Sequence, residues 1–86
     1  MHAVVIDVEI EDEDAALGGL EQLVPAVAQA PGFVAGFWIR LAEDRGTSIA
    51  VYESEEQATS ARPPAGGGAP GVRMRGVTIG EVLASA

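Results

Sequence analysis

Pro31 and Gly32 constrain the fold more than any other feature of this chain, because they separate a helical segment from an alternating strand. A Pro-Gly pair stops a helix, and the strand begins at once with Phe33. One face of this strand carries Phe33, Ala35, Phe37, Ile39 and Leu41, and the other carries Val34, Gly36, Trp38 and Arg40. Both faces are largely apolar, which predicts a strand that is covered on both sides.

The segment before this junction predicts a strand followed by a helix. Val4, Ile6, Val8 and Ile10 alternate with Val5, Asp7, Glu9 and Glu11, so the strand has one wholly apolar face. The acidic residues 12–14 suit a helix N-terminus, where they cap free N–H groups and complement the helix dipole. Apolar residues at helical spacing follow at Leu17, Leu20, Val24, Val27 and Ala28.

The segment after the junction predicts a hairpin and a short helix. Residues 43–46 are typical of a hairpin turn, and residues 47–53 predict the next strand. Ser54 and Gln57 have the spacing of a capping box, which indicates that a helix begins there. Prolines and three successive glycines end this helix and predict a connecting loop over residues 65–71, the most mobile internal segment.

A last alternating segment, residues 72–83, completes the order strand, helix, strand, strand, helix, strand. This order predicts an α+β, ferredoxin-like βαββαβ fold, with a four-stranded antiparallel sheet and two helices on one face. We expect a single domain over residues 1–86. A chain this short cannot cover both apolar faces of its sheet, so we also expect a homodimer that buries sheet against sheet.

Composition excludes several classes of function. The formal net charge of −8 argues against nucleic acid and anionic membranes as partners. There is no Cys and a single His, His2, so no disulfide and no Ser–His or Cys–His catalytic set can form. No phosphate-binding loop follows a strand, and we expect no haem, flavin or metal cofactor. The chain lacks a membrane-length apolar run and a signal-peptide pattern, which favours a cytoplasmic protein.

Three local patterns resemble a known family. They are the Pro-Gly-Phe junction at residues 31–33, the Gly-Phe-Trp strand at residues 36–38, and the strand-to-helix corner Tyr-Glu-Ser-Glu-Glu-Gln-Ala at residues 52–58. Together with the element order, they resemble the antibiotic biosynthesis monooxygenase-like family of dimeric α+β barrels over nearly the whole chain. The resemblance implies a sheet-to-sheet homodimer with a pocket between each sheet and its helices. The family includes cofactor-free oxygenases, haem-degrading enzymes and proteins with no assigned activity.

Departures from that family narrow the activity. The haem-degrading members use an Asn in the first strand, where this chain has Asp7, and a Trp and a His in or near the second helix. Residues 55–62 contain neither Trp nor His, which argues against haem degradation. The resemblance implies that the cofactor-free oxygenases use Asn, Trp and Tyr side chains around a bound phenol. This chain has no Asn, and its Trp38 and Tyr52 lie on strands.

Four residues are candidates for contact with a ligand: Asp7, Trp38, Arg40 and Tyr52. Trp38 and Arg40 share a strand face, and with Tyr52 on the neighbouring strand they would supply a stacking surface and a group for an anion or carbonyl. Asp7 interrupts an apolar strand and would be a partly desolvated base if helices covered it. The alternatives are an Asp7 at the sheet rim or paired with Arg40 or Arg75, and a Trp38 in the core or the dimer interface.

The sequence therefore leaves three classes of function open for this protein. The first is a small homodimeric α+β barrel protein of unassigned activity, which holds a small apolar or aromatic molecule between sheet and helices. The second is a cofactor-independent monooxygenase acting on a phenolic or polyketide-like substrate. The third is a structural or interaction module without a ligand. An open pocket near Trp38 would favour the first two, and a filled one would favour the third.

Overall fold

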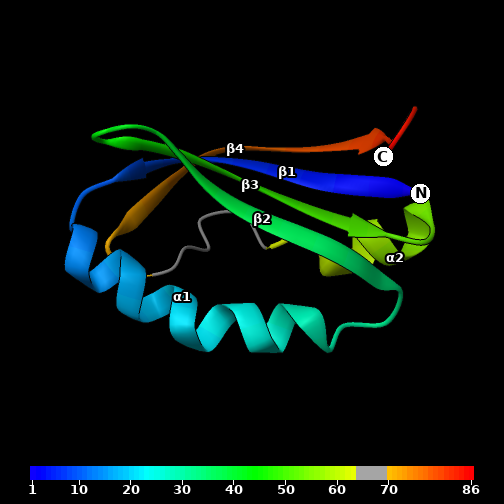
Figure 1. Cartoon of the computed structure of the whole chain (residues 1–86), viewed down its shortest axis with the longest axis horizontal. Coiled ribbons are helices and arrows are strands. Elements are labelled where there is room, and N and C mark those ends of the chain that lie inside the picture. Colours follow the sequence, from blue (N-terminus) through cyan, green and yellow to red (C-terminus); the bar gives the residue numbers. More distant parts are fainter. Residues whose placement is uncertain (64–69) are drawn as a thin grey trace.

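The chain follows the order strand, helix, strand, strand, helix, strand (Figure 1). The computed structural model describes residues 1–63 and 70–86. Its elements are β1 (His2–Ile10), α1 (Glu13–Ala28), β2 (Phe33–Ala42), β3 (Arg45–Tyr52), α2 (Glu55–Ala61) and β4 (Val72–Glu81). The ferredoxin-like α+β fold expected from the sequence is confirmed.

The strands form one antiparallel sheet in the order β2-β3-β1-β4, so the N-terminal strand lies inside the sheet. Figure 1 shows α1 running along one face of this sheet and α2 on the same side, near the end where both termini lie. The main contacts of α1 with the sheet are with β2, whereas α2 contacts β1, β3 and β4. The other face of the sheet has no helix of the described chain against it.

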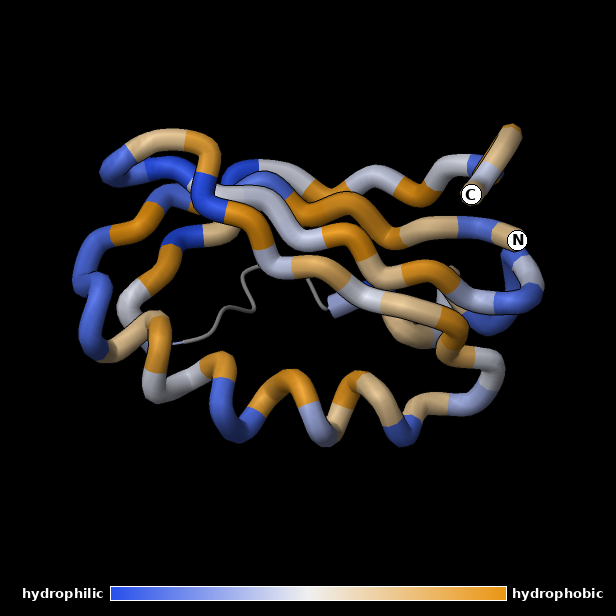
Figure 2. Tube along the Cα trace, in the orientation of Figure 1, coloured by the Kyte–Doolittle hydropathy of each residue, from blue (hydrophilic) through white to orange (hydrophobic). Residues whose placement is uncertain are grey.

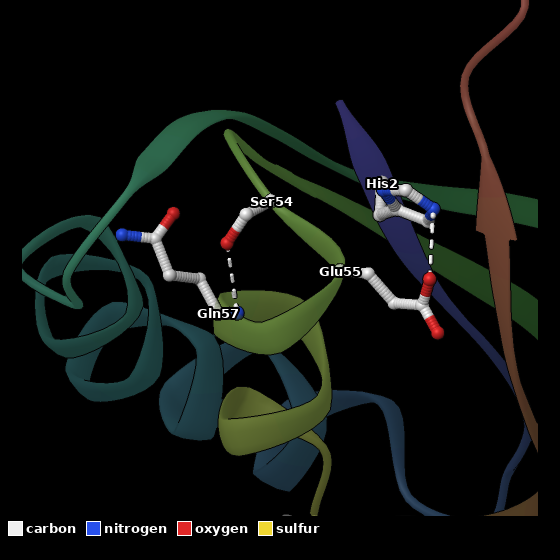
Figure 3. Close-up of polar contacts among 4 residues, drawn as sticks. All are labelled: His2, Ser54, Glu55 and Gln57. Carbon is white, nitrogen blue, oxygen red and sulfur yellow. Dashed lines mark hydrogen bonds and ion pairs between the residues drawn. The ribbon is translucent and has the colours of Figure 1, made fainter.

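Capping side chains start both helices. The Asp12 carboxylate accepts a hydrogen bond from the Ala15 N–H at 3.1 Å, as the acidic run predicts. The Ser54 hydroxyl accepts from the Gln57 N–H at 3.1 Å and caps α2 (Figure 3). The capping box is only half formed, because the Gln57 side chain packs against Gly32 and its buried Oε1 has no hydrogen-bond partner among the described residues.

Two element ends differ from the expected ones. Only Glu43 and Asp44 form the turn of the β2–β3 hairpin, and β3 already begins at Arg45, because that residue and Gly46 pair with the neighbouring strands. Strand β4 ends at Glu81 rather than at residue 83, and the next N–H, that of Val82, donates to the Met1 carbonyl at 2.9 Å. The loop expected to be mobile spans residues 65–71, and its residues 65–69 lie outside the described residues.

Gly71 directly precedes β4 and has a backbone conformation that favours glycine. Its φ is +77°, and its carbonyl accepts hydrogen bonds from the N–H groups of Glu11 and Asp12, at 2.8 and 3.0 Å. The start of β4 is thereby tied to the start of α1. Gly32, in the predicted helix stop before β2, has a φ of +78°.

The register decides which side chains face the helices. Ile6 lies opposite Ser48 on β3, and Ser48 lies opposite Trp38 on β2, so these three side chains share the helix-facing side. Side chains alternate along a strand, so Asp7 points to the opposite face. That outer face is apolar towards the chain termini, where Val5 and Phe37 flank Ile49.

The packed core is small and lies under α2. Val4, Tyr52 and Ala58 are buried there, and the Phe33 ring meets the Tyr52 ring edge-on at a centroid distance of 6.0 Å and an angle of 79°. Within residues 1–63 and 70–86, no helix has the length and apolar character needed to cross a bilayer.

Candidate functional site

A cavity of about 440 Å³ lies between the sheet and α1. Much of its wall is aliphatic and comes from β1 and α1: Ile6, Val8, Ile10, Leu17, Leu20 and Leu23. Figure 2 shows apolar segments on the turns of α1 nearest the sheet and polar segments on the turns away from it. The periodicity that predicts an amphipathic helix therefore aims its apolar face at this cavity.

Small residues on β3 explain why no side chain of the described residues fills this space. The residues of this strand that face α1 are Gly46, Ser48 and Ala50, and all three line the cavity. They lie opposite the aliphatic side chains of α1, and none is large enough to reach them. The small side chains of β3 therefore contribute to the cavity as much as the position of α1 does.

Trp38 lines the cavity on β2, where Gly36 makes room for its ring. A Cβ atom on Gly36 would lie 2.9 Å from Cη2 of the indole, closer than real Cβ contacts come. The ring therefore lies along its own strand over Gly36. The sequence interpretation that places Trp38 beside a pocket agrees with this position.

Arg40 lies two residues further along β2, on the cavity and next to the start of α1. Its Nη2 is 3.0 Å from Oε1 of Glu13, which also lines the cavity. The two side chains are 44 % and 59 % exposed, so the ion pair is accessible from solvent. Glu13 is the only acidic and Arg40 the only basic side chain among the described lining residues.

Asp7 is the candidate that the structure does not bring to the cavity. It is exposed on the outer face of the sheet, across from Thr47 and Gly76, because it is out of phase with the apolar residues that face α1. The alternative pairings with Arg40 or Arg75 do not occur either, since Arg40 pairs with Glu13 and Arg75 with Glu9 at 3.3 Å. The interpretation of Asp7 as a proton-accepting base inside a pocket is therefore wrong.

Tyr52 lines the other end of the cavity. It is only 3 % exposed, and burial raises the pKa of its hydroxyl, because the phenolate loses hydration there. Within residues 1–63 and 70–86 the structure shows no hydrogen bond to that hydroxyl. Gly46 lies opposite Arg40, and Tyr52 lies six residues further along β3, so the two ends of the cavity are about 20 Å apart along the strand.

The single histidine lies outside the cavity. His2 Nε2 is 3.5 Å from Oε2 of Glu55 at the start of α2, as Figure 3 shows. The other ring nitrogen, Nδ1, is buried without a partner among the described residues. His2 therefore joins β1 to α2 and contributes no group to the cavity wall.

Sequence reasoning brought Trp38, Arg40 and Tyr52 to one site and missed Glu13 and Ser48. Glu13 reads as a helix-start residue, and only the crossing of α1 over β2 brings it to Arg40. Ser48 had a usable signal, because it alternates in phase with Gly46 and Ala50 as a run of small residues. Within the described part of the chain, no group of three or more His, Cys, Asp or Glu residues could hold a metal ion.

Comparison of the chain with protein-family models, with curated proteins and with solved structures finds no match.

Proposed function

We propose that this protein is a homodimeric α+β barrel that binds a small apolar or aromatic molecule between its sheet and α1. The observation that carries the proposal is the cavity of about 440 Å³. Small-molecule sites typically have volumes of about 300–1,000 Å³ and apolar walls with a few polar groups. The aliphatic wall, with Trp38, Tyr52 and the Arg40–Glu13 pair, matches that anatomy.

Exposed leucines on α1 support a ligand in this position. Leu17 is 54 % and Leu23 is 38 % exposed, although both line the cavity. A bound apolar molecule would remove this surface from water at a gain of about 25 cal/mol per Å². A structural module without a ligand would be expected to fill the space with its own side chains.

The outer face of the sheet supports the dimer. Phe37 is 57 % and Ile39 is 43 % exposed there. Strands of 8 to 10 residues, four abreast, cover roughly 500–600 Å² of sheet. Two such faces in contact would bury about 1,000–1,200 Å², which reaches the lower limit of stable interfaces.

Native mass spectrometry of freshly purified protein tests both parts of the proposal, since it reports subunit number and any retained molecule. Titration with phenols, quinones and aliphatic compounds should change the fluorescence of Trp38, the single tryptophan. Ser48→Leu should fill the cavity, raise the melting temperature and abolish the fluorescence change. Ser60→Leu on α2 is the control, because Ser60 is exposed, belongs to a helix rather than to the outer sheet face, and is not a lining residue.

The outcomes separate the functional classes. A fluorescence response that survives Ser48→Leu would refute binding in this cavity, and no response to any compound would favour a structural module. Oxygen uptake with a bound hydroquinone would instead assign the protein to the cofactor-independent oxygenases.

A further inference from the structure

We infer that the ligand is an elongated carboxylate amphiphile, whose headgroup replaces the Glu13 carboxylate on Arg40 and whose chain extends past Trp38 towards Tyr52. This inference rests on the proposed function, because it names the chemical class that the same cavity would take.

The headgroup assignment follows from the charges on the wall. Arg40 is the only basic side chain among the described lining residues, and a carboxylate already lies 3.0 Å from its guanidinium. A guanidinium offers five N–H donors in a fork that matches a carboxylate. The contact with Glu13 therefore marks a position that another carboxylate can occupy.

The exchange keeps the charge on Arg40 compensated. Partly exposed ion pairs are weak, so Glu13 can leave Arg40 at little cost. The released side chain is 59 % exposed and lies in the first turn of α1, where the helix dipole favours negative charge. The Glu13 side chain would thus compete with the ligand for Arg40.

The shape of the cavity assigns the rest of the ligand. Its two ends lie about 20 Å apart along β3, and aliphatic side chains of α1 and β1 line the length between them. Trp38 is the aromatic side chain nearest the Arg40 end, two residues before it on β2. An extended alkyl chain fits this long aliphatic wall better than a compact ring does.

Fluorescence titration of Trp38 with decanoate, decanol and decyltrimethylammonium tests the inference. Decanoate should bind up to about fivefold more tightly than decanol, because a partly exposed carboxylate–guanidinium pair is weak and Glu13 competes for Arg40. Arg40→Gln should abolish this preference and leave decanol binding within about twofold. Glu13→Gln should have the opposite effect and tighten decanoate binding several-fold, since it removes the competing carboxylate.

Charge-matched controls separate the local exchange from the overall field of an acidic protein. Arg73→Gln and Glu21→Gln change the net charge as Arg40→Gln and Glu13→Gln do, but both residues are exposed and neither lines the cavity. They should leave the preference for decanoate unchanged. Far-ultraviolet circular dichroism checks that each variant is folded. If Arg40→Gln does not fold, the effect of Glu13→Gln on decanoate binding still decides the test.

Equal binding of decanoate and decanol would overturn the headgroup assignment while the proposed cavity stands. Tighter binding of decyltrimethylammonium would overturn it as well, because Glu13 would then be the recognition group. Equal effects of Glu13→Gln and Glu21→Gln would refute the exchange at Arg40. If only compact aromatic compounds bind, the elongated ligand is wrong, and if nothing binds, the proposed function fails with it.

Discussion

Phe37 offers the sharpest test of the proposed dimer. It lies in the middle of β2, on the sheet face opposite α1 and α2, and is 57 % exposed in the single chain. Ile49 lies directly opposite it on β3, and Val5 lies opposite Ile49 on β1. Phe37→Ser would remove the largest side chain from this row without altering the helix-facing side.

The expected effect follows from the exposed fraction. A Phe side chain has about 200 Å² to bury, so an exposure of 57 % leaves about 110 Å² for an interface. At about 25 cal/mol per Å², this area contributes about 2.8 kcal/mol per subunit. A two-fold interface contains the residue twice, which gives about 5–6 kcal/mol and a dimer dissociation constant weakened roughly 10⁴-fold.

Sedimentation equilibrium over a range of protein concentrations measures that constant. Leu17→Ser is the matched control, because Leu17 is 54 % exposed but lines the cavity under α1, and its loss should leave dimerisation unchanged. If Phe37→Ser weakens the dimer by less than about tenfold, or if both variants weaken it equally, the outer sheet face is not the interface.

The glycines and the single tyrosine give three further expectations. Gly71→Ala should lower the free energy of unfolding by about 3 kcal/mol, since a Cβ at φ +77° would meet the backbone of α1. Gly32→Ala, at φ +78°, should cost less, because the flexible Gln57 side chain can move aside; equal losses in urea titrations would contradict this. Gly18→Ala should raise the melting temperature, since its Cβ meets open space and alanine favours a helix by about 1 kcal/mol; a lower value would refute it. Burial raises the pKa of Tyr52, so the folded state keeps its proton longer and stability should fall as pH rises above about 10. Urea titrations of Tyr52→Phe should lack that fall, and an unchanged pH dependence would be evidence against it.

The sequence predicts the element order because each boundary has a local physical cause. Pro31 and Gly32 stop α1, Ser54 caps α2, and two-residue alternation identifies the strands. The exact ends of the strands depend on pairing partners as well as on local sequence. Arg45 reads as a turn residue, yet it pairs with Glu9 on β1, a contact that depends on a partner far away in the chain.

The candidate site is predictable only in part. Trp38, Arg40 and Tyr52 come together because strand alternation and pairing put them on one face. Asp7 does not join them, because its phase along β1 differs from that of Ile6 and Val8. The wholly apolar face of β1 was the better guide to the side that the helices cover. The cavity itself depends on how far α1 stands from the sheet, which no local pattern encodes.

The strand order has a consequence for how the chain folds. The β2–β3 hairpin is local and can form within about 1–10 μs, but β1 must pair with β3 and also with β4, which follows all the other elements in chain order. During synthesis β1 therefore cannot complete its pairing until β4 has been made. A truncation that removes β4 would leave apolar β1 as an unprotected edge, where a second chain could pair and begin aggregation.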